Sequence, residues 1–438
     1  MSSVGASSGA PQVAVIGGGY AGMAAAVTLA GQGIACRVFE AGKVLGGRAR
    51  RIPAHDNTLL DNGQHILVGA YRELLRLMQL VGTPASAVAR HPLTLRLHPA
   101  FSLRAPNLPA PWHLAWALLA ARGLSLQDKF AALRLCQALK RCAFQVSPDM
   151  SVAQLFAQHR QTARVTQLLW EPLCLAALNT PIARASAQVF AHVVRDTLFQ
   201  SSADSDLILP RIDLSALFPE PAARWLVARG SQVETSQRID RIAHEGGAFR
   251  IATQHGTTFA CDAVICAVAP HQLEVLALPV ALAPPDFKYE PIFTVYLRYP
   301  QRIELPFPMT GCVQGLVQWL FDRDALCAST GVIAAVISAS GGHQAQEHAH
   351  LAQRVHDELQ ELTGALPDPL WHKVIAEKFA TFACEPNLQR PGAQTALDGF
   401  YLAGDYTASE YPATLEGAVR SGIRAAQLAH RFLTTRLL

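Results

Sequence analysis

The chain carries VAVIGGGYAG at residues 13–22, followed directly by MAAAVTLA at residues 23–30. The apolar, β-branched character of the first four positions predicts a short buried parallel strand. The apolar run that follows the glycines predicts a helix. The sequence therefore predicts a strand, a glycine-rich turn and a helix in immediate succession.

The glycine-rich turn has the spacing Gly-x-Gly-x-x-Gly, formed by Gly17, Gly19 and Gly22. The first glycine permits a tight turn, the second lets the backbone approach a pyrophosphate, and the third lets the helix pack closely on the strand. The first helical residues, Tyr20 and Ala21 among them, would present free N–H groups and the positive end of the helix dipole to phosphates. The turn therefore predicts a dinucleotide site.

A second apolar run, residues 35–39, ends in Glu40, eighteen residues after Gly22, with Ala41 next. An acidic side chain at this position accepts hydrogen bonds from ribose hydroxyls and repels a 2′-phosphate. Strand, helix, strand and acid together make the prediction much stronger than the glycine motif alone. They leave both NAD and FAD open.

A second glycine turn, Gly46-Gly47-Arg48, carries a cation. It is placed to close over the pyrophosphate from the other side, because an arginine suits bidentate contact with a phosphate. A surface turn with a solvated arginine is the alternative that these residues alone leave open.

Composition limits the class of protein. The 438 residues suffice for two or three domains, and 50% are hydrophobic against 16% charged. The apolar runs are too short to cross a bilayer, and residues 1–11 predict a flexible leader in place of a signal peptide. The nine cysteines are scattered without a Cys-x-x-Cys pair, which favours reduced thiols in the cytoplasm and argues against a metal site.

Residues 74–148 form a basic segment, which contains nine lysines and arginines and a single acid, Asp128. The segment includes an apolar stretch at 108–119 with Trp112 and Trp116. Tryptophans beside basic residues favour a helix that lies in the headgroup region of an anionic membrane. A core helix with a solvated basic face is the alternative. Nucleic acid is not an expected partner, because no binding motif accompanies the charge.

The C-terminal region repeats the opening pattern. Residues 399–405, GFYLAGD, predict an apolar strand that ends in Gly404-Asp405, and residues 415–422, LEGAVRSG, open a long helix. Together with the two glycine turns, these motifs resemble the FAD-dependent amine oxidase and phytoene desaturase superfamily. The resemblance involves both ends of the chain.

The resemblance implies that FAD is held between the two ends. The first turn, Glu40 and Arg48 would hold the ADP half, with the backbone of Val233 against adenine. Asp405 would bind near the phosphates or the ribitol, and the helix from Leu415 would direct its positive end at the flavin pyrimidine. The residues expected to contact the cofactor are Gly17, Gly19, Tyr20, Ala21, Gly22, Glu40, Ala41, Gly46, Gly47, Arg48, Gly63, Gln64, His65, Val233, Gly404, Asp405, Thr414, Leu415, Glu416 and Ala418.

Departures from the amine oxidases narrow the expected chemistry. Thr414 stands where those enzymes carry a tyrosine of an aromatic cage, which disfavours an amine substrate. The Cys-Tyr pair used for covalent attachment is absent, since Cys384 precedes Glu385, so noncovalent FAD is expected. A second dinucleotide motif is also absent, so electrons would come from the substrate, from transiently bound NADPH or from a partner reductase.

Three segments look most like the squalene-associated desaturase group, which includes the hydroxysqualene dehydroxylases. They are residues 61–71, DNGQHILVGAY; residues 170–173, WEPL, with 177–179, ALN; and residues 410–417, EYPATLEG. The group implies a role in hopanoid synthesis, in which FAD-dependent reduction removes the allylic hydroxyl of hydroxysqualene, a long apolar isoprenoid, to give squalene. The expected location is cytoplasmic, peripheral on the inner face of the cytoplasmic membrane.

Departure of a hydroxyl requires an acid near the flavin, for which Glu410, Tyr406 and His65 are the candidates. Each of the three also has a structural explanation. Two other functions stay open, namely oxidative desaturation of a carotenoid precursor and redox-inert binding of polyprenyl lipids. The sequence does not predict the oligomeric state.

The expected fold is α/β, and its domains are expected to interleave because strand and helix patterns return several times between the two ends. A Rossmann-type FAD-binding domain, with a parallel sheet, helices and a small antiparallel sheet, would comprise residues 12–75, 225–285 and 375–438. A mixed, largely helical substrate domain would comprise residues 76–224 and 286–374.

Overall fold

The computed structural model describes residues 12–54, 56, 58–99, 101–282 and 286–436. The expected leader, residues 1–11, lies outside the described residues, as does the expected domain boundary at 285. Within the described ranges, no helix combines the length and the apolar character that crossing a bilayer requires.

A five-stranded parallel sheet forms the first half of the molecule, with the strand order β10-β2-β1-β14-β20. Its central strand β1 (Val13–Ile16) pairs with β2 (Cys36–Phe39) and β14 (Ala263–Cys266), and the edges are β10 (Gln232–Glu234) and β20 (Phe400–Leu402). The sheet is therefore assembled from segments at both ends and in the middle of the chain. The predicted α/β fold class is confirmed.

Different layers cover the two faces of this sheet, because successive side chains of a strand point to opposite sides. Val13 and Val15 are buried together with the helices α1 and α14. Ala14 and Ile16 are buried on the other face with the antiparallel sheet β11-β12-β13. The bounds of these elements are Tyr20–Gly31 for α1, Leu415–Arg436 for α14, Ile239–Glu245 for β11, Ala248–Thr253 for β12 and Thr258–Cys261 for β13.

The helices α1 and α14 touch backbone to backbone. A methyl group added to Gly422 of α14 would lie 2.1 Å from the carbonyl oxygen of Ala21 in α1. Ser421, next to that glycine, accepts a hydrogen bond at 2.8 Å from the amide of Gly404 at the end of β20. The C-terminal strand and helix are thereby fixed on the N-terminal turn.

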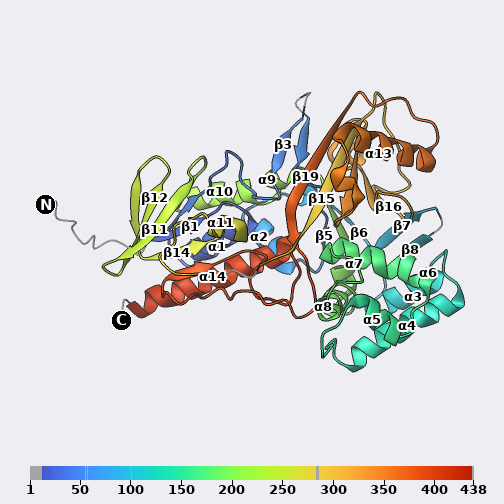
Figure 1. Ribbon diagram of the computed structural model, residues 1–438, viewed down its shortest axis with the longest axis horizontal. Helices are drawn as coiled ribbons and strands as arrows, with labels where there is room; N and C mark the ends of the chain where they lie inside the picture. The colour runs from blue at the N-terminus through green and yellow to red at the C-terminus, as the bar shows by residue number, and fades with distance from the viewer. Residues whose placement is uncertain (1–11, 55, 57, 100, 283–285, 437–438) are drawn as a thin grey trace.

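The second half is a mixed lobe built on a seven-stranded sheet of order β19-β15-β18-β17-β16-β7-β8. The helix α13 (His348–Thr363) packs on β15 and β19 of this sheet. In Figure 1 the lobe lies to the right of the parallel sheet. The strands run Thr94–His98 (β7), Phe101–Arg104 (β8), Tyr289–Arg298 (β15), Met309–Cys312 (β16), Trp319–Asp322 (β17), Val332–Ser338 (β18) and Trp371–Phe382 (β19).

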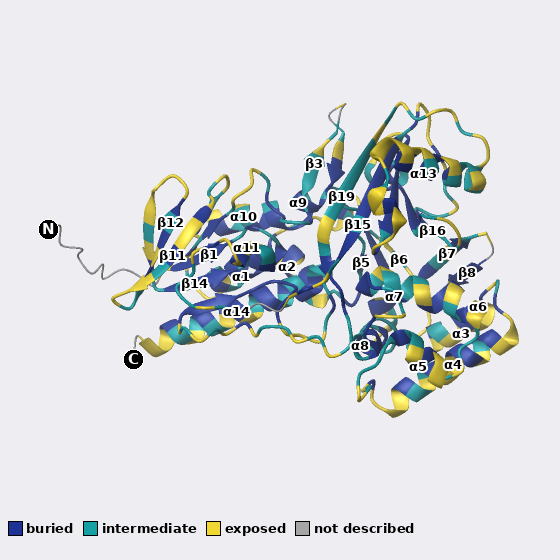
Figure 2. Cartoon of the chain, viewed as in Figure 1, coloured by how far each residue is buried: buried dark blue, intermediate teal, exposed yellow. Residues whose placement is uncertain are grey.

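Helices at the end of this lobe complete it (Figure 1). The second of them begins with a capping box, in which Ser125 and Asp128 satisfy each other's backbone amides. Many residues of this helical end are exposed in Figure 2. The helices are Trp112–Ala120 (α3), Leu126–Arg141 (α4), Val152–Gln158 (α5), Ala163–Val165 (α6), Glu171–Leu178 (α7) and Ala187–Leu198 (α8), with a π-helical turn at Thr166–Trp170.

Shorter elements connect the two halves. Two small sheets have the orders β3-β4 and β5-β9-β6. The remaining elements are Arg51–Pro53 (β3), Leu59–Asp61 (β4), Leu67–Val68 (β5), Arg72–Leu80 (α2), Val88–His91 (β6), Leu207–Pro210 (β9), Leu214–Leu217 (α9), Pro219–Val227 (α10), Pro270–Leu273 (α11) and Arg323–Cys327 (α12), with short 3₁₀ turns at Ala85–Ala87, Ser202–Ser205 and Gly342–Ala345.

Three predicted domain boundaries fall inside single elements. The boundary at 75/76 lies within α2, whose buried Leu77 and Met78 share a core with α1 and α14. The boundary at 374/375 lies within β19, which pairs with β15 along its length. The boundary at 224/225 lies within α10 (Pro219–Val227), which packs on α1. The cofactor half therefore includes all of α2 and α10, whereas the second lobe includes all of β19.

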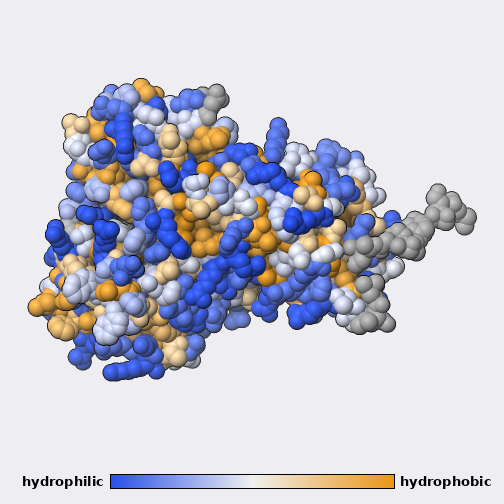
Figure 3. All heavy atoms as spheres, turned by 180° about the vertical axis from the view of Figure 1, so that it is seen from behind, coloured by the Kyte–Doolittle hydropathy of each residue, from blue (hydrophilic) through white to orange (hydrophobic). Residues whose placement is uncertain are grey.

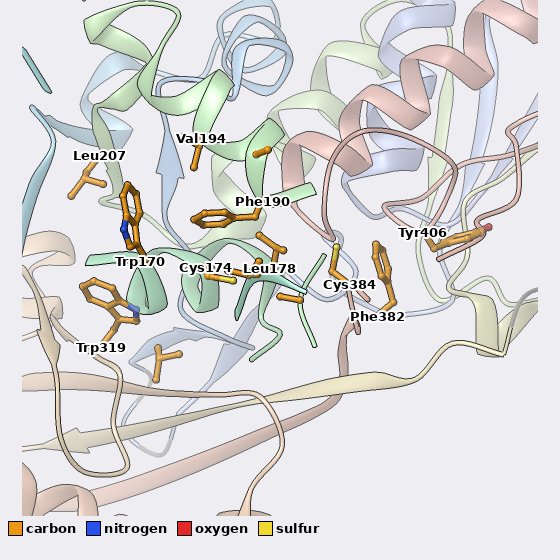
Figure 4. Close-up of a cluster of buried hydrophobic side chains, with 14 of the residues drawn as sticks. Trp170, Cys174, Leu178, Phe190, Val194, Leu207, Trp319, Phe382, Cys384 and Tyr406 are labelled. Atoms are coloured by element: carbon orange, nitrogen blue, oxygen red, sulfur yellow. The ribbon is translucent and has the colours of Figure 1, made fainter. Parts of the chain in front are cut away.

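A buried aromatic cluster joins the helices of the second lobe to its sheet. Figure 4 shows Trp170 lying between Phe190 of α8 and Trp319 of β17. The rings of Trp170 and Phe190 meet edge to face with centroids 6.4 Å apart, and the indole N–H donates to Gln161 at 2.8 Å. The WEPL motif at 170–173 thus starts with a residue that has a packing role.

We expect Gly422→Ala to lower the free energy of unfolding by about 1–3 kcal/mol, because the added methyl group would force α1 and α14 apart. Chemical denaturation of the FAD-loaded protein measures this change. Gly31→Ala is the matched control, since no atom lies within 4 Å of a methyl group at the end of α1. Equal stability of the two variants would contradict the close contact.

Candidate active site

A single cavity of about 1070 Å³ runs from the two glycine turns into the helical end of the second lobe. It exceeds the range of about 300–1,000 Å³ that most ligand sites occupy. Its lining changes along its length from backbone and polar groups at the parallel sheet to aliphatic and aromatic side chains between the helices.

The first glycine turn would accept an added methyl group without a clash at one position only. A methyl group on Gly17 would lie 2.8 Å from the carbonyl oxygen of Ala267, and one on Gly22 would lie 1.9 Å from that of Gly17. A methyl group on Gly19 would meet nothing closer than 3.7 Å, on the side facing Gly47. The outer glycines therefore serve packing, and the middle one faces the cavity.

The N-terminus of α1 opens onto the cavity without a side-chain cap. Gly19 is the N-cap residue, and no side chain accepts from the first amides of the helix. Tyr20 and Ala21 line the cavity, with the Tyr20 hydroxyl held by donation to the carbonyl of Leu214 at 2.8 Å. Free helix amides with a positive dipole end form a site for a phosphate or another anion.

Glu40 lies at the end of β2, beside this turn. Its carboxylate accepts hydrogen bonds from the amides of Gly18 and Gly42, each at 2.7 Å. Each carboxylate oxygen keeps a further lone pair for a ribose hydroxyl. Glu40 and Ala41 both line the cavity, as Gly19 of the glycine turn does.

The second glycine turn lies directly against the first. The amide of Gly46 donates to the carbonyl of Gly18 at 3.0 Å, and Gly46 has a φ of +123°, which only glycine adopts readily. Arg48, which ends this turn, donates to Asp405 at 2.6 Å and to the carbonyl of Ala380 at 2.7 Å. The ion pair thus joins the N-terminal turns to the C-terminal Gly-Asp.

The N-terminus of α14 also faces the cavity. Thr414 caps the helix by accepting from the amide of Gly417 at 3.1 Å, and Thr414, Leu415 and Ala418 line the cavity. The carboxylate of Glu416 instead accepts from the amides of Glu73 and Leu74 at 3.1 and 3.0 Å. That side chain therefore caps α2.

A loop between β4 and β5 contributes Gly63, Gln64 and His65 to the lining. The Gln64 carbonyl oxygen accepts from Arg323 at 2.8 Å, and Arg323 also lies 3.4 Å from the carboxylate of Asp61. Both members of this ion pair are buried, and burial raises the pKa of Asp61 to about 6. The ion pair thus fixes the loop between β4 and β5 through the hydrogen bond from Arg323 to Gln64.

The three candidate acids lie in different surroundings. His65 contacts the carbonyl of Gly63 through Nδ1 at 2.8 Å, so that nitrogen carries the proton, and burial lowers the pKa of the ring. Tyr406 lines the cavity, its buried hydroxyl has no partner among the described residues, and burial raises its pKa well above 10. Glu410 lies outside the cavity lining, more than half exposed and paired with Arg195 at 3.0 Å.

Most of the predicted cofactor residues meet at this end of the cavity. The lining includes Gly17, Gly19, Tyr20, Ala21, Glu40, Ala41, Gly46, Gly47, Arg48, Gly63, Gln64, His65, Gly404, Asp405, Thr414, Leu415 and Ala418. Gly22, Val233 and Glu416 are not part of the lining. Gln237 and Asp240, which follow Val233 along the chain, are part of it.

The residues present fit an FAD. The uncapped end of α1 and the side-chain-free backbone at Gly19 suit a pyrophosphate, and Glu40 suits a ribose. The unpartnered hydroxyl of Tyr406 would find a polar partner in a ligand placed there. Cys136 is the one cysteine of the nine, all of them described, that lines the cavity, and it lies in α4 at the opposite end.

One polar pair in the lining was not predicted from the sequence. Tyr411, three residues before Thr414, donates to the carboxylate of Asp196 in α8 at 3.2 Å. Burial raises the pKa of Tyr411 to about 12. The two residues are 215 positions apart, so no local pattern connects them. Both residues belong to the cavity lining.

The apolar end of the cavity is walled by three kinds of element. They are the helices α3, α4, α7 and α8, the strands β7 and β8, and the face of the large sheet that carries Trp319. Seen from behind in Figure 3, hydrophobic residues gather in the middle of the molecule, between its two halves. Lining side chains here include Leu93, Leu95, Leu103, Leu114, Leu118, Leu133, Leu169, Trp170, Leu173, Val193, Phe199, Ile292, Trp319 and Phe321.

Comparison with known proteins identifies relatives over nearly the whole chain. The family described as "Flavin containing amine oxidoreductase" matches residues 20–430. Hydroxysqualene dehydroxylase of Zymomonas mobilis is 30% identical, covering 95% of this chain and 98% of the relative. The enzyme of the same name from Rhodopseudomonas palustris is 30% identical over 95% and 97%. Zeta-carotene desaturase of Arabidopsis thaliana is 23% identical over 94% and 84%.

Solved structures share the fold at low sequence identity. An oxidoreductase from Methanosarcina mazei superposes with a TM-score of 0.72 at 15% identity, covering 95% of this chain and 99% of the other. A putative protoporphyrinogen oxidase from Exiguobacterium sp. 255-15 gives 0.67 at 16% identity, covering 98% and 100%. At such identities the likeness concerns the fold alone.

A double-mutant cycle on Arg48→Met and Asp405→Asn tests the pair that joins the two ends of the chain. We expect a coupling free energy of about 1 kcal/mol for unfolding of the FAD-free protein, because the arginine is partly solvated. Each single variant would also retain less FAD after gel filtration, measured by absorbance. Strictly additive stability changes would contradict a direct interaction.

Proposed function

The chain belongs to the flavin-containing amine oxidoreductase family, in the group of the hydroxysqualene dehydroxylases, and from this membership we propose that it reductively removes the allylic hydroxyl of hydroxysqualene to give squalene. It is an FAD-dependent oxidoreductase. The observation that carries the proposal is the single cavity, which joins the predicted cofactor residues to an apolar chamber without an intervening wall. A flexible, water-insoluble isoprenoid requires such a chamber.

The reaction replaces a carbon–oxygen bond by a carbon–hydrogen bond. The hydroxyl leaves with a proton as water, and the resulting allylic cation accepts a hydride. FAD, when bound and reduced, supplies that hydride. The protein must therefore hold the polyene beside the cofactor, keep other water away from the cation and deliver one proton to the leaving oxygen.

The apolar end of the cavity provides the first two of these contributions. The lining here includes Trp170, Trp319 and the leucines around them. The only hydrogen-bonding side-chain groups of these residues are the two indole N–H groups, and that of Trp170 already donates to Gln161. Asn179 nearby is also fully engaged, since its amide donates to Thr381 at 3.0 Å and accepts from Ala339 at 2.9 Å. Water in this chamber would find few partners.

Tyr406 is the proposed proton donor. Its hydroxyl carries a proton throughout the neutral pH range, because burial raises the pKa well above 10, and it has no acceptor among the described residues. Departing hydroxide is a stronger base than a phenolate, since bulk water has a pKa of about 15.7. A phenol hydroxyl with no other acceptor among the described residues is therefore a suitable donor to the leaving oxygen.

The other two candidates have different proposed tasks. Neutral His65 donates through Nδ1 to Gly63, so its Nε2 is an acceptor and suits orienting the substrate hydroxyl. Glu410 is held at the surface by Arg195 and has a structural task there. The N-terminus of α14 adds a positive dipole end beside the cofactor, which stabilises negative charge there.

The electron supply and the location complete the proposal. Transiently bound NADPH or a partner reductase would reload the cofactor, since the sequence holds one dinucleotide motif. The nine free cysteines and the basic segment 74–148 support a cytoplasmic protein at the inner face of the cytoplasmic membrane. Oxidative desaturation of a carotenoid precursor is the second candidate, supported by the 23% identity to zeta-carotene desaturase.

The proposed reaction is tested by anaerobic incubation of the FAD-loaded protein, reduced with dithionite, with hydroxysqualene. We expect squalene, identified by gas chromatography and mass spectrometry, with stoichiometric reoxidation of the cofactor. Absence of squalene would overturn the proposal. Desaturation of phytoene by the oxidised protein, in a parallel incubation, would favour the carotenoid alternative.

For the proton donor, we expect Tyr406→Phe to lower the single-turnover rate about 100-fold while FAD remains bound, because only the hydroxyl is lost. Glu410→Gln is the control and should keep the rate within about twofold, as its side chain lies outside the cavity lining. Rapid-quench measurement of squalene checks both. An unchanged rate in Tyr406→Phe would assign the proton to another group.

A further inference from the structure

The helices α3 and α4 carry an exposed apolar surface, here called the α3–α4 face. Its members recur at helical spacing, i, i+4 and i+7, in each helix. Trp112 is 68% exposed and Trp116 is 56% exposed. The α3–α4 face consists of Trp112, Trp116 and Leu119 from α3, and Leu126, Phe130 and Leu133 from α4.

This clustering sets the α3–α4 face apart from the rest of the described surface. Thirteen large hydrophobic side chains are exposed among all the described residues, and seven of them fall between positions 108 and 133. The others are scattered over distant elements, such as Val227 on α10 and Leu370 before β19. A contiguous exposed apolar patch marks a surface that another phase or molecule covers.

Other residues of the same two helices line the cavity, and Leu133 belongs both to the α3–α4 face and to the lining. Leu114 and Leu118 of α3, and Ala132 and Cys136 of α4, belong to its lining. The sequence of α3, WHLAWALLA, contains no Lys, Arg, Asp or Glu. A helix that is apolar all round is normally buried or in contact with lipid. Here a single layer of two helices separates the apolar chamber from the surroundings.

Charge around the α3–α4 face is positive. Arg104, Arg122 and Arg141 are exposed, and no carboxylate lies within ion-pair distance of them among the described residues. Lys129 donates to a backbone carbonyl at the end of α3. The one acid of the segment, Asp128, is buried, and its carboxylate accepts from Ser125 and Thr162.

From these observations we propose that the α3–α4 face docks on a bilayer that contains anionic lipid, and that the isoprenoid enters the cavity between α3 and α4. Exposed tryptophans suit the headgroup boundary, and the unpaired arginines suit anionic headgroups. The docking itself follows from this surface alone. The entry route rests in addition on the proposed function.

A protein partner fits the face less well. An acidic protein surface would satisfy the arginines, but it would leave unexplained why an apolar chamber lies directly behind the exposed tryptophans. Lipid satisfies both features at once, because it is anionic at the headgroups and apolar beneath them. A lipid-soluble substrate would then pass into the chamber without crossing water.

Flotation of the full-length, FAD-loaded protein with vesicles tests the docking without any substrate. We expect binding to vesicles with about a third phosphatidylglycerol at low salt, weakening at about 0.5 M NaCl, and little binding to pure phosphatidylcholine. Trp116→Glu combined with Phe130→Glu should lower partitioning at least about tenfold. Val227→Glu, an equally exposed apolar position on α10, is the matched control and should bind as the wild type does.

The charges are tested separately. Arg122→Gln with Arg141→Gln should weaken binding to anionic vesicles about fivefold for each charge removed. Arg241→Gln with Arg424→Gln, exposed arginines in the other half of the molecule, should leave it unchanged. Equal flotation of wild type and Trp116→Glu/Phe130→Glu would overturn the proposal. So would a wild-type dimer in light scattering that this double variant makes monomeric, because the face would then serve self-association.

The entry route has its own readout. Squalene formation from vesicle-embedded hydroxysqualene should fall with the double Glu variant in proportion to its lost binding, whereas formation from detergent-dispersed substrate should remain at the wild-type level. Full activity of that variant on vesicles would overturn the route. If flotation succeeds and no squalene forms with any variant or wild type, the docking stands and the proposed function fails.

Discussion

The contact between α1 and α14 is the constraint on which the rest of the structure depends. It brings the backbone at Gly422 against that of Ala21, with no room for a side chain between them. Through it, the amide ends of two helices from opposite ends of the chain open onto one cavity. The Arg48–Asp405 ion pair forms at the same junction. A cofactor with two charged regions can be held there because the positive ends of both helices open onto the cavity.

Much of the cofactor half could be predicted, because its determinants are local. The glycine spacing at 17–22 and the acid at Glu40 follow from a strand–turn–helix unit that any dinucleotide site requires. The pairing of Arg48 with Asp405 was not predicted, since it joins residues 357 positions apart. Similarly, Glu416 belongs to a cofactor motif in sequence, yet its carboxylate caps α2. A motif identifies the residue type at a position, whereas the packing of the fold determines the direction of its side chain.

The apolar end of the cavity lay beyond sequence reasoning for a different reason. Its lining comes from many separate segments, each of which has an ordinary hydrophobic pattern that also fits a core. Trp170 illustrates this ambiguity, because it lines the cavity and packs edge to face on Phe190 as well. No sequence motif contains the buried Arg323, which donates to Gln64, so its role in the site could not be predicted. Such residues become recognisable only when the fold has placed them side by side.

The strand order has a consequence for how the protein is made. β1, near the start of the chain, can pair on one side only after β14 has been synthesised. β14 in turn can pair on its other side only after β20, which ends at Leu402. On the ribosome, the nascent chain therefore exposes an unpaired apolar strand during most of its synthesis. The cavity lining is complete only after the N-terminus of α14 has emerged, because Leu415 and Ala418 belong to it. An apolar strand left unpaired for this long favours aggregation of the early chain.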